Sequence, residues 1–350
     1  MTHPPTEPGP GGLPQPQQPP QYAPGASYDP AQAYVVYQAV PTSGYGIPTS
    51  GQAGFDPMIS PDYNGWWQRS LTIFKGAWRQ LAVLQFIGFV LTLAVLIPEG
   101  IWAATAFEGI YTTSEGDVGN VDLTGLLAPF ALIFVGTVLA GLVGCVITVA
   151  GNHIAVAVAA GVPPRIGPAL GLAARRFLPL WGWQLLASVI IGLGVCACLL
   201  PGIYLYAVFV TLPAVVTFER NLGAIGRCFQ IFHRDFGSAA ARIATIAGLT
   251  LVIGIVSYVV AQIIAAAFTG TGSAASGTAL TAAAVAGVVV SQVFSTLLES
   301  GMKMLTDVLT VTAYADLRAR LEPLSTPVLA AEVGITPATA ASQWVAPPPA

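Results

Sequence analysis

The chain has 350 residues, of which 54% are hydrophobic and only 8% are charged, and its formal net charge at pH 7 is -3. Soluble globular proteins carry about 25% charged residues, so this composition argues against a soluble protein. It also argues against nucleic acid as a partner, because phosphate backbones are bound by many Lys and Arg side chains. A mean hydropathy of +0.70 instead favours helices that are surrounded by lipid.

The first segment, residues 1–62, is polar. It contains 14 of the 28 prolines, many Gln, Gly, Ser and Tyr residues, and no Lys or Arg. Such a segment cannot bury enough apolar surface to offset the entropy of ordering, so we expect a disordered cytoplasmic tail. Its spaced tyrosines suit an interaction tract for another membrane or cytoplasmic protein, and a solvated leader without a ligand is the simpler alternative. The segment lacks the features of a secretory signal peptide.

Four long runs without Asp, Glu, Lys or Arg follow, at residues 80–98, 123–164, 177–218 and 243–298. A helix needs about 20 residues to cross a bilayer. The fourth run would form about 84 Å of helix, so we expect it to fold back within the Gly- and Ser-rich residues 270–277. The third run is expected to turn at Pro201 and Gly202. That turn leaves one helix over residues 178–200 and a short one over 203–218.

The second run forms either one span or two, and the basic residues decide between these alternatives. Lys and Arg gather on the cytoplasmic side of membrane spans. With one span, continued by an interfacial segment near Asn152 and His153, all 13 basic residues of the chain fall on one side. The sequence therefore predicts an all-α membrane protein of the inner membrane, with about six transmembrane helices in three hairpins and both termini cytoplasmic.

The membrane domain is expected to cover residues 63–322, and residues 323–350 are expected to form a flexible, Ala- and Pro-rich cytoplasmic tail. Stretches that mix aromatic, aliphatic and basic residues precede the three hairpins, at residues 66–78, 170–177 and 222–236. This pattern predicts juxtamembrane helices that lie in the headgroup region. True internal repetition and a generic juxtamembrane composition both remain open.

Three charged residues recur on one face of the last predicted helix. Glu299, Lys303 and Asp307 follow each other at intervals of four, so Lys303 can pair with either acid. A proton or ion relay is one interpretation, because charges in a membrane are often functional. The favoured interpretation is an ion pair at the cytoplasmic boundary, since a full apolar span over residues 278–298 precedes them.

Other polar residues give weaker indications. Cys196 and Cys198 could bind a soft metal or exchange disulfides, but the sequence offers few histidine partners, so we expect neither a metal nor a cofactor. Gln184, Gln262 and Gln292 lie within predicted spans, where they either line a path or hold helices together. The sequence also shows none of the catalytic motifs of phosphate-binding loops, zinc proteases or serine hydrolases.

Two stretches resemble a known family. The first begins at Pro201 and Gly202, continues through residues 212–216 to Glu219, and ends at residues 232–236. The second closes the last predicted helix and has the pattern Tyr-x-Asp-x-Arg-x-Arg, at Tyr314, Asp316, Arg318 and Arg320. Both are similar to the polytopic membrane domain that is attached to some bacterial glycerophosphoryl diester phosphodiesterases and also occurs as a stand-alone membrane protein of unknown function.

The resemblance covers residues 65–322 and implies the membrane module, not the hydrolase, because the phosphodiesterase is a separate soluble barrel that has no counterpart here. One departure is that residues 207–209 are Ala, Val and Phe, where the family often carries an Arg. In physical terms, Asp316 could pair with Arg320 at i+4, and Tyr314 would anchor the helix end at the interface.

We therefore expect a membrane protein without catalytic activity of its own that serves as a scaffold or a lipid-interacting module, with membrane lipids as its partners. Transport of a small solute or lipid past Gln184, Gln262, Gln292 and the Glu299 region is the competing hypothesis. A membrane enzyme that acts on lipid headgroups is the weaker alternative.

Overall fold

The computed structural model describes residues 56–113, 123–219, 223–270 and 282–336, and the regular secondary structure within these ranges is entirely helical. The helices are α2 (Tyr63–Thr113), α3 (Leu123–Ala159), α4 (Ile166–Ala197), α5 (Leu199–Phe209), α6 (Leu212–Phe218), α7 (Ala224–Arg234), α8 (Phe236–Gly270), α9 (Ala282–Ala319) and α10 (Thr326–Glu332). Six stretches of these helices are long and apolar enough to cross a membrane. The predicted all-α class with about six spans is confirmed.

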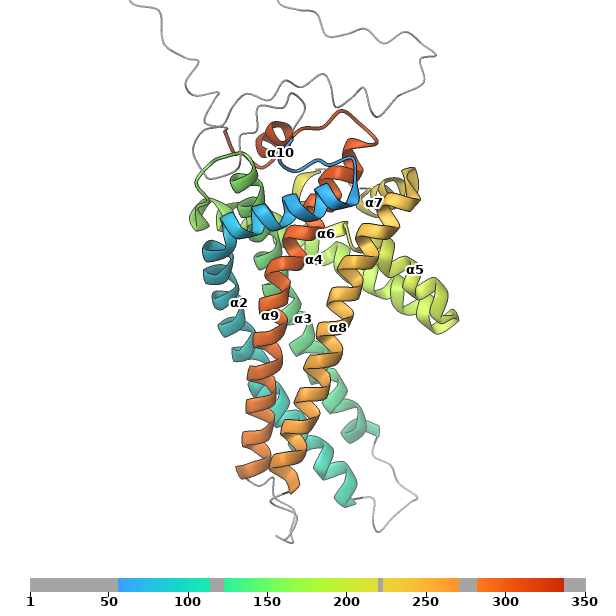
Figure 1. The fold of residues 1–350 in the computed structure, drawn as a ribbon. Helices are drawn as coiled ribbons and strands as arrows, with labels where there is room; N and C mark the ends of the chain where they lie inside the picture. The colour runs from blue at the N-terminus through green and yellow to red at the C-terminus, as the bar shows by residue number, and fades with distance from the viewer. Residues whose placement is uncertain (1–55, 114–122, 220–222, 271–281, 337–350) are drawn as a thin grey trace, which may run out of the picture.

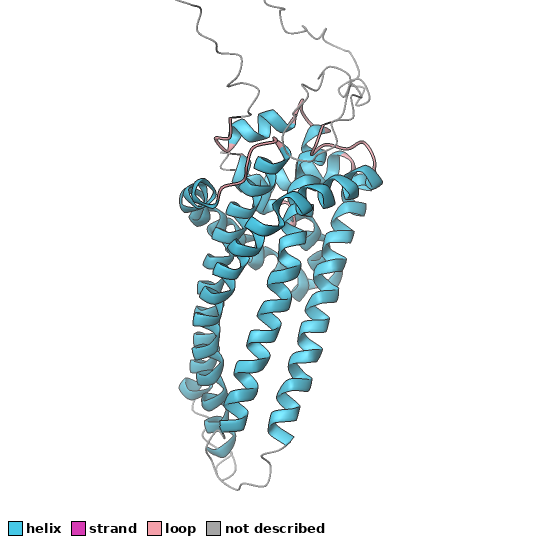
Figure 2. Ribbon diagram, turned by 60° about the vertical axis from the view of Figure 1, so that its left-hand side comes forward, coloured by secondary structure: helices cyan, strands magenta, loops and turns pink. Residues whose placement is uncertain are grey.

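Four long helices, α2, α3, α8 and α9, run side by side and form an elongated bundle (Figures 1 and 2). Helices α8 and α9 run antiparallel, so the fourth apolar run folds back as predicted, although most of the expected turn lies outside the described residues. The 35 residues of α8 and the 38 of α9 correspond to about 52 and 57 Å of helix. Both are therefore longer than a bilayer core of about 30 Å.

The outer surface of this bundle is apolar. Along α8, Leu251, Val252 and Ile263 are each at least 60% exposed, and only 6% of the most apolar window of the helix is buried inside the protein. An apolar face of this extent would make a soluble protein aggregate, but it matches the hydrocarbon of a bilayer. The structure therefore supports an integral membrane protein.

Most of the buried residues lie at one end of the bundle, which we call the head and which comprises residues 56–79, 147–160, 212–242 and 308–336. Every residue of α3 in the head is buried, as expected for a helix enclosed by other helices. The interfacial position expected for Asn152 and His153 is wrong, because both are buried. The Asn152 amide donates a hydrogen bond to Thr217 (3.1 Å), so its polar group is satisfied inside the protein.

The first turns of α2 lie across the head before the helix turns along the bundle (Figure 1). Trp66, Ser70, Ile73 and Ala77 are buried, at the spacing of one helical face. The indole N–H of Trp66 donates to the Thr312 hydroxyl at 3.1 Å, and Ser70 shares a hydrogen bond with the same hydroxyl at 2.6 Å. The predicted amphipathic segment is therefore docked on α9, and only its other side is exposed.

Helices α4 and α5 form a hairpin that leans away from α8, and its tip does not extend to the far end of the bundle (Figure 1). The 11 residues of α5 correspond to about 16 Å, roughly half of a bilayer core. The predicted fourth helix over residues 203–218 is in fact two helices. Its second part, α6, is almost entirely buried in the head.

The chain reverses at Cys198, whose backbone is extended, so the turn predicted at Pro201 and Gly202 is displaced by three residues. Pro201 fits the first turn of α5, where a missing N–H breaks no helical hydrogen bond. Gly202 faces α4, and a Cβ atom there would lie 2.9 Å from the backbone nitrogen of Val195. The glycine therefore allows the two helices to approach closely, which is a packing role and not a turn.

The domain boundaries expected at residues 62 and 323 are also corrected. Met58, Ile59 and Leu329 are buried in the head. The carboxylate of Asp56 accepts the backbone N–H groups of Met58 (2.8 Å) and Thr326 (2.8 Å), which ties the start of the described chain to the start of α10. Composition did not indicate this packing, because residues 56–62 and 323–336 are short segments within longer polar or Ala- and Pro-rich stretches.

These contacts predict different results for two N-terminal deletions. Removal of residues 1–55 leaves every described contact of the head in place, and the melting temperature in detergent should stay unchanged. Removal of residues 1–62 exposes the sites of Met58 and Ile59 and should cost about 3–5 kcal/mol, because burying such a side chain contributes about 1.5–3 kcal/mol. Equal melting temperatures for the two shortened proteins, measured by fluorescence-detected chromatography, would contradict this account.

Candidate functional site

The residues of the two family-like stretches meet in the head and form a network of ion pairs. Glu219, which directly follows α6, accepts a hydrogen bond from the hydroxyl of Tyr314 at 2.8 Å. The Nε atom of Arg227 lies 2.9 and 3.1 Å from the two carboxylate oxygens of Glu219. Arg318 adds a longer contact of 3.7 Å. The carboxylate of Glu219 therefore joins α6, α7 and α9.

Arg318 extends this network to the C-terminal helix. Its two Nη atoms each lie 2.8 Å from one oxygen of Glu332 in α10, and its guanidinium also pairs with Glu322. One Nη atom donates to the hydroxyl of Tyr314 at 3.1 Å. The ring of Tyr314 stacks on Phe218 with centroids 5.5 Å apart. Tyr314 is fully buried, so the interfacial anchor expected for it is wrong.

Asp316 is the centre of a second group of ion pairs in the head. Its carboxylate lies 2.7 Å from Arg242 of α8 and accepts the backbone N–H of Ser60 at 3.0 Å. The side chains of Asp316 and Arg242 are 0% and 2% exposed. The predicted pair with Arg320 is present at 3.4 Å, but it is the longer of the two contacts. The guanidinium of Arg242 also lies 5.8 Å from the ring centre of Trp66.

Arg320 connects this group of ion pairs to Asp235, which directly precedes α8. Its guanidinium pairs with Asp235 and also donates to the carbonyl of Pro61 at 3.1 Å. Burial alone would raise the pKa of Asp235, but hydrogen bonds from Ser238 and Arg320 outweigh it and hold this pKa below the usual range. All four residues of the Tyr-x-Asp-x-Arg-x-Arg pattern thus contribute to the packing of the head.

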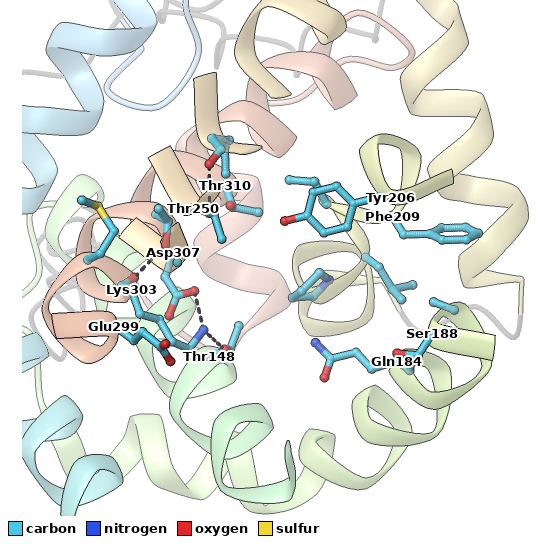
Figure 3. Close-up of a pocket in the computed structure, with 18 of the residues that line it drawn as sticks. Thr148, Gln184, Ser188, Tyr206, Phe209, Thr250, Glu299, Lys303, Asp307 and Thr310 are labelled. Carbon is cyan, nitrogen blue, oxygen red and sulfur yellow. Dashed lines mark hydrogen bonds and ion pairs between the residues drawn. The ribbon is translucent and has the colours of Figure 1, made fainter. Parts of the chain in front are cut away.

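A cavity of about 580 Å³ adjoins the head and lies between α3, α4, α5, α6, α8 and α9 (Figure 3). Its volume falls in the range of small-molecule sites, about 300–1,000 Å³. The polar residues that line it are Thr148, Asn152, Gln184, Ser188, Tyr206, Thr250, Glu299, Lys303, Thr306, Asp307 and Thr310. Its apolar wall includes Ile191, Phe209, Ile246 and Ile253.

The charged side of the cavity belongs to α9. The ammonium of Lys303 lies 2.8 Å from Asp307 and donates to the Thr148 hydroxyl of α3 at 2.7 Å. Of the two pairings open to Lys303, the structure therefore has the one with Asp307. Glu299 lies one turn farther from the head and lines the same cavity (Figure 3). It is 20 residues, or about 30 Å, from the end of α9 at Ala319, and so lies near the middle of the helix.

The opposite wall comes from the inclined hairpin. Gln184 and Ser188 of α4 and Tyr206 and Phe209 of α5 face the charged residues across the cavity (Figure 3). The carbonyl of Gln184 accepts the thiol of Cys145 at 2.9 Å, which fixes the direction of its amide. Tyr206 remains 42% exposed although it lines the cavity, so this rim lies at the surface of the protein.

The three glutamines of the predicted path are not brought together. Gln184 lines the cavity, Gln262 is exposed on α8, and Gln292 lies against Gly100 of α2. Glu99 was not among the residues expected at a site, because it directly follows the first apolar run, which ends at Pro98. Helix α2 instead continues, and the Glu99 carboxylate packs so closely on Gly136 that a Cβ atom there would collide with it. A glycine facing the middle of α2 was the available signal.

The cysteines lie apart from this site. Cys196 and Cys198 are exposed at the tip of the hairpin, whereas Cys145 and Cys228 are buried. Burial raises the pKa of the Cys228 thiol to about 12, which makes it unreactive. Among the described residues, no group of three or more His, Cys, Asp and Glu side chains could hold a metal ion.

Comparison of the chain with protein-family models, with curated proteins and with solved structures finds no match.

The buried pair of Asp316 and Arg242 predicts strong coupling between the two residues. Asp316→Asn or Arg242→Met alone should destabilise the protein by about 3–5 kcal/mol, because each leaves a charge buried without its closest partner. The double variant should lose much less than the sum of the two. Unfolding in mixed micelles measures these values, and Glu322→Gln, at a half-exposed carboxylate, serves as the control. Additive losses would contradict the coupling.

Proposed function

We propose that this protein is a lipid-binding module of the inner membrane, without catalytic activity of its own. The observation that carries the proposal is the open cavity of about 580 Å³ beside the inclined hairpin. The cavity combines the charged side chains of α9 with apolar surface from Ile191, Phe209 and Ile253, and an amphiphile needs both kinds of surface. Tyr206 lines the cavity and is 42% exposed, so part of the cavity wall reaches the surface of the protein, where a lipid of the bilayer can approach it.

The size of the cavity supports a lipid headgroup as its occupant. A volume of about 580 Å³ equals roughly 20 water molecules at about 30 Å³ each. This is enough for a headgroup with the first carbons of its chains. The rest of the chains would remain in the bilayer, along the exposed side chains of Ile203 and Ile255.

We also propose that the head serves as a scaffold that holds the cavity together. Its ion pairs join the start of the described chain, α6, α7, α8, α9 and α10 into one unit, while α9 also forms the charged wall of the cavity. These contacts hold the charged wall of the cavity in a fixed position relative to the other helices of the head. We propose relatedness to the membrane domain of the glycerophosphoryl diester phosphodiesterases on the same ground, because the matching residues Glu219, Tyr314 and Arg318 contact one another.

Cysteine labelling tests the proposed orientation, in which the head and both termini are cytoplasmic. In a protein without its native cysteines, Ser273→Cys should react with an impermeant maleimide in intact cells. Arg175→Cys should react only after permeabilisation, because the positive residues stay inside. Labelling of Arg175→Cys in intact cells would overturn the orientation.

Two glycines of α8 offer a matched test of lipid binding. Gly254 lines the cavity and Gly248 does not, and at both positions a Cβ atom would meet no described atom within 4 Å, so each accepts a side chain. Gly254→Trp should fill the cavity and lower the lipid that co-purifies about tenfold, as measured by native mass spectrometry. Gly248→Trp should retain the wild-type amount. Equal retention by both variants would contradict the proposed function.

Transport is the second candidate, and the position of Glu299 favours it. A charged residue near the middle of a membrane helix is typical of a substrate or ion path. Polar residues continue on the same side of α9 toward its start, at Ser295 and Gln292. Uptake of a solute by vesicles that contain the purified protein, with loss in Glu299→Gln, would favour transport over binding alone.

A further inference from the structure

The charges of the cavity are not balanced. Lys303, Asp307 and Glu299 all line it, which gives two carboxylates for one ammonium. Lys303 is already engaged, because Asp307 at 2.8 Å neutralises its charge and the hydroxyl of Thr148 at 2.7 Å takes a second N–H. The ammonium therefore has little capacity left to hold an anionic group.

Glu299 is the remaining charged group. It lies one helical turn from Lys303 and points toward the same cavity (Figure 3). No hydrogen bond or ion pair joins it to another side chain in the part of the chain that the structure describes. A carboxylate in a membrane helix is stabilised by a counter-charge or by a proton, since low-polarity surroundings penalise an isolated ion.

The other side chains around the cavity suit a cation as that counter-charge. Tyr206 and Phe209 line the wall opposite α9, and aromatic rings attract ammonium groups through their negative faces. The Gln184 carbonyl keeps a second lone pair beside the one used by Cys145. An anionic group would instead meet the carboxylates of Glu299 and Asp307.

We infer that the cavity binds a ligand through a positively charged ammonium group, which pairs with Glu299. This inference rests on the proposed function and names the class of ligand that the cavity takes. Two sources share this chemistry, the ammonium of a zwitterionic lipid headgroup and a free small amine. The lipid source fits the part of the cavity wall at Tyr206 that reaches the protein surface.

Binding of lipids with defined headgroups tests the inference. Purified protein is titrated with phosphatidylethanolamine, which carries an ammonium, and with phosphatidylglycerol, which does not, and bound lipid is counted by native mass spectrometry. Wild-type protein should prefer phosphatidylethanolamine at least tenfold. Glu299→Gln, which keeps the shape of the side chain and removes its charge, should abolish this preference.

Asp307→Asn provides a second, independent change. It releases the ammonium of Lys303 and removes one carboxylate from the cavity, so it should shift the preference toward phosphatidylglycerol by about tenfold. Both Glu299→Gln and Asp307→Asn should lower the preference for phosphatidylethanolamine. If one of the two variants fails to fold, the other still tests the inference. Melting temperatures identify such a failure, and Glu322→Gln, outside this cavity, is the control that should keep the wild-type preference.

Competition with ethanolamine separates the two sources. If millimolar ethanolamine leaves the bound phosphatidylethanolamine unchanged, the ligand is the lipid, and displacement assigns the site to a free amine. A wild-type preference for phosphatidylglycerol, or an unchanged preference in Glu299→Gln, would overturn the inference. In that case a loss of all lipid in Gly254→Trp would still support the proposed function, whereas equal retention in Gly254→Trp and Gly248→Trp would reject the proposed function itself.

Discussion

The structure depends on the pairing of buried charges in the head. Asp316 and Arg242 are almost completely removed from solvent, and the closest counter-charge of each is the other, 2.7 Å away. Such a pair adds little stability compared with an apolar replacement, but it strongly penalises any arrangement that separates α8 from α9. The same constraint applies to Glu219 and Arg318, so the network specifies how the head assembles more than how stable it is.

The cavity follows from this arrangement. Helix α9 is held at its head end by Asp316 and Arg318, and its next turns toward the bundle centre carry Asp307, Lys303 and Glu299. The head also contains α6, which is buried there. Helix α5 of the inclined hairpin leads directly into α6, so the head fixes the end of the hairpin. Space therefore opens between a fixed helix and a leaning hairpin, and polar residues of the fixed helix occupy its wall. One set of ion pairs positions both the scaffold and the candidate binding site.

Much of the fold could be predicted from the sequence, because apolar run length sets the helices. The ion pairs and the cavity were harder to predict, because spacing along one helix indicates only partners on the same helix. The i+4 rule found Arg320 for Asp316, but the closer partner, Arg242, lies 74 positions earlier in the chain. The same rule allowed Lys303 to pair with Glu299 or with Asp307. In the structure its ammonium contacts Asp307 and also Thr148 of α3, a partner that spacing along α9 could not reveal.

Glu99 was missed and the role of Gly202 was misjudged for a related reason, because local sequence alone was used at both positions. An acid after a proline resembles a helix end, and Pro-Gly resembles a turn. In the structure both residues lie inside helices and are explained by the opposing helix, Gly136 for Glu99 and Val195 for Gly202. Helix contacts of this kind depend on tertiary geometry, which no local pattern contains.

The inclined hairpin has a mechanical consequence for the bilayer. Because α4 and α5 end short of the far end of the bundle, the cross-section of the protein is larger in the half of the bilayer nearer the head than in the other half (Figure 1). Lipids in the two leaflets must then cover different areas around each molecule. An array of such wedge-shaped proteins would bend the membrane so that the head lies on the convex side, and it would concentrate where the membrane is already curved in that direction.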